Sequence, residues 1–145
     1  MLRGGIPVIV TFCTDGRWVL PQDVRSTVLK YCLHDNGIRL TAHAAVVMPD
    51  HVHLLFSPLE GPDGVPFGLS EIMQGIKGAS AHSVNKSLGR SGRVWEPEYY
   101  DRLLRREESV LAAASYILQN PVRKGLVGEG EAYEWVWSAF DTFVP

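Results

Sequence analysis

"IRLTAHAAVVMPDHVHLLF", residues 38–56, places two apolar stretches on either side of a Pro-Asp pair. Both stretches have the composition of β-strands, and Pro49-Asp50 is a typical tight connection. The pattern therefore predicts a hairpin with strands over 38–48 and 51–56. Side chains alternate between the two faces of a strand, so His51 and His53 share one face while Val52 points to the other.

Further elements are expected on both sides of this hairpin. They are a strand at 7–12, a helix at 21–35, a helix at 69–88, a strand after Pro97 within 94–105, and a helix at 107–119 that Asn120-Pro121 ends. The order is β-α-β-β-α-β followed by one more helix. It predicts an α+β fold, a ferredoxin-like sandwich with an antiparallel sheet plus an extra C-terminal helix.

Length and composition are those of an ordinary globular domain. The chain has 145 residues, of which 46% are hydrophobic and 21% charged. We expect one domain over 1–145, with the aromatic segment "EAYEWVWSAFDTF" (131–143) packed back on the body. The two cysteines form no C-x-x-C pair, and neither a secretory signal nor a membrane-spanning stretch is evident. The cytoplasm is the simplest expected compartment.

The formal net charge of −2 argues against a generic nucleic-acid binder, but its distribution is uneven. Residues 77–106 carry seven Lys and Arg against only four Asp and Glu outside the run "REE" that they enter. A one-sided basic surface is therefore compatible with the sum. Charge counting alone favours the simpler interpretation, a solvated face of helix and loop.

The two histidines admit two interpretations. If buried as structural groups, each would need its own polar partner. Standing side by side on one face, His51 and His53 can instead turn one nitrogen each toward a divalent cation. We favour the metal site for this pair, and a third protein ligand is then expected.

Tyr116 and Asn120 are four residues apart on the last predicted helix and so share one face. A tyrosine hydroxyl beside a metal-bound phosphate is a plausible nucleophile, and an amide at a helix end often faces a site. Taken alone, however, this pair fits equally simple roles better. Tyr116 would join the apolar face of the helix, and Asn120 would be a C-cap.

Four segments resemble one known family. "MPDHVHLLF" (48–56) resembles the HUH motif (His, bulky apolar residue, His) of single-strand DNA transposases and relaxases. "YILQNPVRKGLV" (116–127) is similar to the signature of REP-associated tyrosine transposases, relatives of small insertion-sequence transposases. "VWEPEYYDRLLRREE" (94–108) and "WVWSAF" (135–140) resemble the segment before the catalytic helix and the tail of that group. The resemblance runs from about residue 7 to the end.

This resemblance implies an activity and a site. His51, His53 and Asn120 would hold Mg²⁺ or Mn²⁺, and Tyr116 would attack a DNA phosphodiester to give a 5′-phosphotyrosine link and a free 3′-hydroxyl. The substrate would be single-stranded DNA with hairpin or palindromic elements, acted on by a monomer or a homodimer. The protein would be a bacterial, cytoplasmic and nucleoid-associated nickase-ligase. Asp50 stands where many relatives have Asn, and we expect the turn to tolerate either.

The same interpretation assigns the basic residues to DNA. Phosphate contacts are expected from Lys77, Lys86, Arg90, Arg93, Arg102, Arg105, Arg106, Arg123 and Lys124. Trp95, Tyr99 and Tyr100 are candidates for stacking on unpaired bases.

Two other functions remain open from the sequence. One is a non-catalytic module that binds hairpin DNA or RNA on the same fold. The other is a metal-dependent hydrolase of a different phosphodiester, which would use water as its nucleophile.

Overall fold

A five-stranded antiparallel sheet forms the centre of the computed structural model, which describes residues 5–140. Its strands are β1 (Val8–Cys13), β2 (Leu40–Val47), β3 (His51–Pro58), β4 (Tyr100–Leu103) and β5 (Val136–Ser138). They lie in the order β4-β1-β3-β2-β5. The predicted α+β fold and the predicted hairpin of β2 and β3 are both confirmed.

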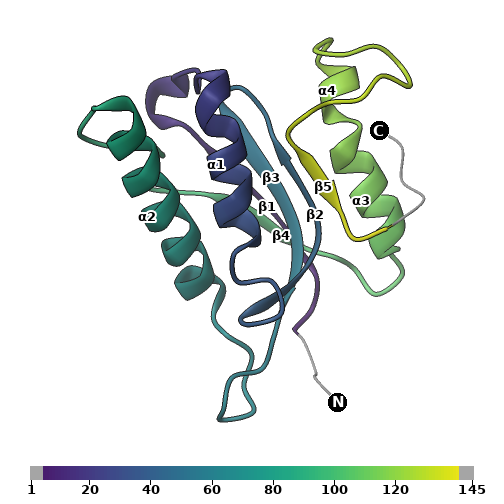
Figure 1. The fold of residues 1–145 in the computed structure, drawn as a ribbon. Helices are drawn as coiled ribbons and strands as arrows, with labels where there is room; N and C mark the ends of the chain where they lie inside the picture. Colours follow the sequence, from purple (N-terminus) through teal and green to yellow (C-terminus); the bar gives the residue numbers. More distant parts are fainter. Residues whose placement is uncertain (1–4, 141–145) are drawn as a thin grey trace.

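The helices divide between the two faces of the sheet (Figure 1). They are α1 (Gln22–Leu33), α2 (Leu69–Leu88), α3 (Val110–Leu118) and α4 (Asn120–Arg123), with a 3₁₀ turn η1 (Asp15–Arg17) after β1. In Figure 1, α1 and α2 lie on one side of the sheet, and α3 and α4 lie on the other. Within the described residues, no helix is both long and apolar enough to cross a membrane.

The alternation of β1 and β3 determines which side chains enter the core. Val10 and Phe12 of β1 and Val52 of β3 have no exposed surface. Phe12 packs edge-on against Trp95, with ring centroids 4.7 Å apart, and the indole N–H of Trp95 donates to Ser80 of α2. This face is therefore sealed by α1 and α2, which leaves the other face for α3 and for the histidines. Trp95 belongs to this core, so its predicted stacking on bases is wrong.

The last predicted helix differs from the expectation at both ends. It begins at Val110, because Ser109 is the N-cap and accepts a hydrogen bond from the Ala112 N–H (3.2 Å). Asn120-Pro121 does not end helical structure but begins the short helix α4. Proline is tolerated in a first helical turn, where its missing N–H would have no intrahelical partner.

The aromatic C-terminal segment packs back on the body, as predicted, and adds the edge strand β5. Residues 141–143 of the predicted segment lie outside the described residues. Val136–Ser138 pairs with β2, Tyr133 and Trp135 are buried, and the Tyr133 hydroxyl donates to the Val47 carbonyl (2.7 Å). This buried hydrogen bond fixes the segment to the end of β2.

Replacing Tyr133 with Phe should lower the free energy of unfolding by about 1–2 kcal/mol, because the Val47 carbonyl loses a buried donor while the ring still packs. Chemical denaturation of the wild type and the variant measures this difference. Tyr100→Phe is the matched control, since Tyr100 is 65% exposed. Equal losses in the two variants would contradict the role of this hydrogen bond.

Candidate active site

His51 and His53 lie next to each other on the sheet face that α1 and α2 leave free. Their ring centroids are 4.9 Å apart, with the rings nearly perpendicular. Each ring has its Nδ1 engaged by a neighbour: Asp50 Oδ1 lies 2.7 Å from that of His51, and Thr11 Oγ1 lies 2.8 Å from that of His53. The shared face is therefore confirmed, and the engaged Nδ1 atoms leave Nε2 as the nitrogen available to a ligand.

His53 is neutral at physiological pH. Burial lowers its pKa to about 4, and the nearby charges of His51, Arg123 and Lys124 act in the same direction. An imidazole must be unprotonated to bind a metal ion, so this environment keeps His53 in the required state. Thr11 reaches His53 because β1 and β3 pair with these two residues opposite each other.

Helices α3 and α4 bring Tyr116 and Asn120 to the same place. The Tyr116 side chain is 66% exposed, whereas Asn120 is buried. Both line a pocket of about 450 Å³ whose other walls come from β1, β3, β4 and α4. The lining residues are Ile9, Thr11, His53, Arg102, Tyr116, Ile117, Asn120, Arg123 and Lys124. Tyr116 is thus not part of the helix's apolar face, and the proposed nucleophile, one histidine and the third candidate ligand share one pocket.

Arg123 connects these groups. Its guanidinium lies 4.1 Å from the centroid of the Tyr116 ring, and its Nη2 is 3.4 Å from Asn120 Oδ1. Stacking on a guanidinium restrains an exposed aromatic ring. An amide oxygen has two acceptor lone pairs, so Asn120 Oδ1 can accept from Arg123 and still face a cation.

The side chains present fit a divalent cation. They offer two imidazole nitrogens with their other nitrogens already engaged, one of them in a ring held neutral, together with a buried amide oxygen. Between residues 5 and 140, no three His, Cys, Asp or Glu side chains gather in a metal-binding cluster. The candidate set differs from such a cluster because its third member is an amide.

Several of the basic residues lie at this pocket. Arg102, Arg123 and Lys124 line it directly. Glu108 holds Arg102 through two hydrogen bonds of 2.7 and 3.2 Å and also accepts from the Arg105 backbone N–H. These hydrogen bonds hold the pKa of Glu108 at about 2, so it stays ionised at physiological pH. Arg105 and Arg106 are exposed in the segment that leads into α3.

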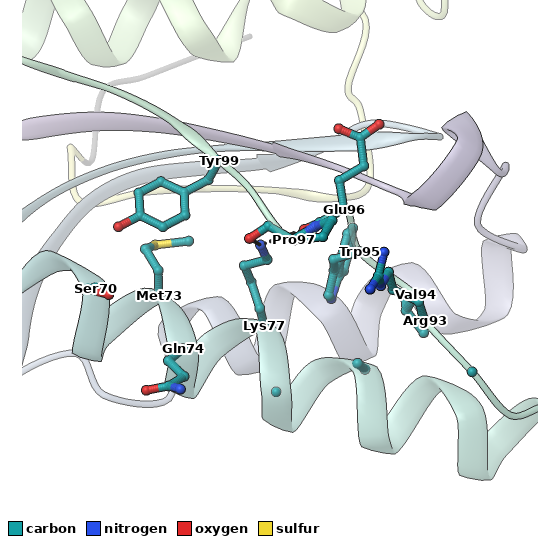
Figure 2. Close-up of a pocket in the computed structure, with 13 residues that line it drawn as sticks. Ser70, Met73, Gln74, Lys77, Arg93, Val94, Trp95, Glu96, Pro97 and Tyr99 are labelled. Carbon is teal, nitrogen blue, oxygen red and sulfur yellow. Dashed lines mark hydrogen bonds between the residues drawn. The ribbon is translucent and has the colours of Figure 1, made fainter.

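The remaining basic residues lie on the side of α2, away from the histidines. Figure 2 shows Lys77 reaching from α2 toward the chain at 96–97. Its Nζ donates to the carbonyls of Glu96 (2.7 Å) and Pro97 (3.1 Å), and burial lowers the pKa of this amine. Arg90 stacks on Trp18, whereas Lys86 and Arg93 are exposed. The structure therefore separates these four residues from the pocket, and it already engages Lys77 and Arg90 in structural contacts.

Four contributors to the site were not identified from the sequence: Thr11, Asp50, Glu108, and Arg123 as a partner of Tyr116. Thr11 is found only once β1 is aligned opposite β3. Arg123 reaches back to Tyr116 because α4 continues after a change of direction at Gln119. The predicted antiparallel sheet contained a signal for Thr11, but the sequence contained none for the stacking of Arg123.

Comparison with known proteins places the chain in a family. The sequence model described as "Transposase IS200 like" matches residues 9–120. This protein therefore belongs to the family of IS200-like transposases. It resembles, within that family, the REP-associated tyrosine transposases: relatives of that name from Haemophilus influenzae (26% identity over 102 residues, 67% of this chain) and Escherichia coli K12 (26% over 98 residues, 68% of this chain) match it.

The alignments leave part of each relative unmatched. They span 57% and 53% of those two proteins, so the chain matches a little over half the length of each. The fold agrees with a solved structure of a REP-associated tyrosine transposase bound to a REP hairpin. The TM-score is 0.64 at 22% identity, covering 88% of this chain and 73% of the other.

Proposed function

We propose that this protein is a metal-dependent single-strand DNA endonuclease and strand transferase that cleaves near hairpins through a 5′-phosphotyrosine intermediate. The observation that carries the proposal is the pocket shared by exposed Tyr116, His53 and Asn120. Membership in the IS200-like transposases supports DNA cleavage, and the hairpin bound to the solved neighbour supports the class of substrate.

In the proposed reaction, the Tyr116 oxygen attacks the phosphorus of a DNA phosphodiester. A bond forms between the phenolic oxygen and phosphorus, and the bond from phosphorus to the 3′-oxygen breaks. The phenolic proton leaves to solvent, and the departing 3′-oxygen takes up a proton to become a free hydroxyl. A second 3′-hydroxyl can reverse the step and join a new strand, so no nucleotide cofactor is needed.

Each neighbouring side chain has a part in this step. His51, His53 and Asn120 would hold Mg²⁺ or Mn²⁺, which supplies charge neutralisation at the attacked phosphate. Arg123 restrains the Tyr116 ring by stacking, and its remaining N–H groups can donate to phosphate oxygens. Arg102 and Lys124 add positive charge to the pocket walls, where a DNA backbone would lie.

The direct test is a search for a covalent adduct. The protein is incubated with single-stranded DNA that carries a hairpin with a randomised stem and a randomised single-stranded flank, together with Mg²⁺ or Mn²⁺. We expect a denaturation-resistant protein–DNA adduct that forms only with the added ion. Salt-sensitive binding without an adduct under either ion would contradict the proposal and favour the non-catalytic binding module.

Removal of Arg102 should weaken binding of single-stranded DNA and reduce its salt dependence. A lost phosphate contact lowers the slope of log K against log salt by about 0.7 on single strands. Fluorescence anisotropy over a salt series measures this for Arg102→Ala. Arg39→Ala is the control, because Arg39 pairs with Asp35 and Glu71 away from the pocket. An unchanged slope in Arg102→Ala would show that Arg102 makes no phosphate contact.

A further inference from the structure

The loop after β1 contains an unusual backbone conformation beside the histidines. Arg17 has φ +56°, the only positive φ of a non-glycine residue in the described chain, and it directly follows Gly16 at φ +62°. A bulky residue in the left-handed region costs free energy, and such strain persists only where surrounding contacts maintain it. The contacts that Arg17 makes therefore indicate what this conformation achieves.

The Arg17 side chain ends on the residue that precedes the HUH motif. Its Nε donates to Asp50 Oδ2 (3.0 Å), and the other oxygen of the same carboxylate, Oδ1, lies 2.7 Å from His51 Nδ1. One carboxylate thus connects the guanidinium to the imidazole. Burial raises the pKa of Asp50, but the hydrogen bonds from Arg17 and His51 outweigh this effect and lower it overall, so the carboxylate is ionised at physiological pH.

The backbone around Asp50 is fixed by the same loop. Buried Thr14 donates its N–H (3.0 Å) and its hydroxyl (3.2 Å) to the Asp50 carbonyl, and the Leu20 N–H donates to the Pro49 carbonyl (2.7 Å). The turn between β2 and β3 therefore cannot shift independently of the loop after β1. Asp50 is held at both its main chain and its side chain.

We propose that Asp50, oriented by Arg17, is a positioning residue that fixes His51 as the Nδ1–H tautomer and directs its Nε2 lone pair into the site. The inference deepens the proposed function, on which it rests for the identity of the Nε2 ligand. Second-sphere carboxylates act on metal-binding histidines in this way: they set the tautomer, orient the ring and raise the basicity of the ligating nitrogen.

The two histidines are supported differently. Thr11, the partner of His53, is a hydroxyl that can donate or accept, so it does not by itself impose a tautomer. The Asp50 carboxylate can only accept, so the Nδ1 of His51 must carry the proton. An asparagine at position 50 would still offer an amide oxygen, but a neutral acceptor forms a weaker hydrogen bond than a carboxylate. The aspartate is therefore more than a turn residue.

The first experiment needs no metal. Long-range ¹H–¹⁵N NMR of the metal-free wild-type protein, at mildly alkaline pH, reports which ring nitrogen of each neutral histidine is protonated. We expect His51 as the Nδ1–H tautomer in the wild type and in Asp50→Asn, and loss of that preference in Asp50→Ala. A wild-type His51 found as the Nε2–H tautomer would overturn the proposal, whatever the activity of the protein.

The second experiment measures affinity for Mn²⁺ in the full chain by titration calorimetry. Asp50→Ala should weaken Mn²⁺ binding about 10- to 100-fold, with Arg17→Ala and Asp50→Asn giving smaller losses. Asp23→Ala, an exposed change on α1, should leave the affinity unaltered. Hairpin DNA binding without metal should stay the same in all variants, which a general loss of structure would not allow.

The two experiments separate the two proposals. If the wild type binds no Mn²⁺ while His51 is the Nδ1–H tautomer, the metal-dependent mechanism fails and the positioning by Asp50 stands. If Mn²⁺ binds normally in Asp50→Ala, the positioning role fails and the proposed function stands.

Discussion

Tyr116→Phe should abolish formation of the covalent protein–DNA adduct, with a fall in the rate of strand cleavage on the order of 10⁴-fold or more. The variant loses only the attacking oxygen, and enzymes that lose their nucleophile commonly lose this much. The phenyl ring can still stack on Arg123, so the pocket and the DNA affinity should be retained. Single-turnover cleavage of a hairpin substrate, together with a binding titration, separates these two effects.

The control for this variant is Tyr100→Phe. Tyr100 is another exposed tyrosine, on the edge strand β4, with 65% of its surface accessible against 66% for Tyr116. Its loss should leave the cleavage rate within about twofold, as expected for an exposed side chain outside the pocket. Continued cleavage by Tyr116→Phe without an adduct would instead identify water as the nucleophile and support a phosphodiester hydrolase.

His53→Ala should reduce metal-dependent cleavage by at least about 10²-fold and weaken Mn²⁺ binding, because one of three proposed ligands is removed. His51→Ala should have a comparable effect. Binding of hairpin DNA in the absence of metal should survive both changes, since the basic side chains at the pocket remain. Cleavage rates measured across a range of Mn²⁺ concentrations provide the test.

His34→Ala is the matched control for the histidine variants. His34 follows α1, its side chain is 66% exposed, and its Nδ1 contacts only the neighbouring Asp35 among the described residues. It should show wild-type rates at every Mn²⁺ concentration. A His53→Ala protein that cleaves normally at low Mn²⁺ would remove this histidine from the proposed ligand set.

The parts of the fold predicted well are those governed by short-range periodicity. The helix over 69–88 was predicted with its observed bounds, although Gly75 and Gly78 disfavour helix, because its apolar residues pack on the sheet. The shared face of His51 and His53 follows from the two-residue period of a strand. At the last helix, the two acidic residues before Ser109 suggested an earlier start than the capping hydrogen bond allows.

The candidate site was predictable only in part, because much of it depends on contacts between distant segments. Tyr116 and Asn120 were identified by helical spacing and by resemblance, and the structure adds that they share a pocket with His53. Trp95 was considered for DNA binding, but a tryptophan beside basic residues does not reveal from sequence that its indole is buried against Phe12. The role of Asp50 was also missed, because Arg17 comes from a loop more than thirty residues earlier.

The central claim, that Tyr116 forms a covalent bond with the 5′ side of the cut, is tested most directly by peptide mapping. A hairpin substrate is cleaved with Mn²⁺, the adduct is digested with protease and nuclease, and the modified peptide is sequenced by mass spectrometry. The account predicts a nucleotide linked through its 5′-phosphate to Tyr116, with a free 3′-hydroxyl on the released strand. Attachment to any other residue, or a 3′-phosphate link, would contradict it.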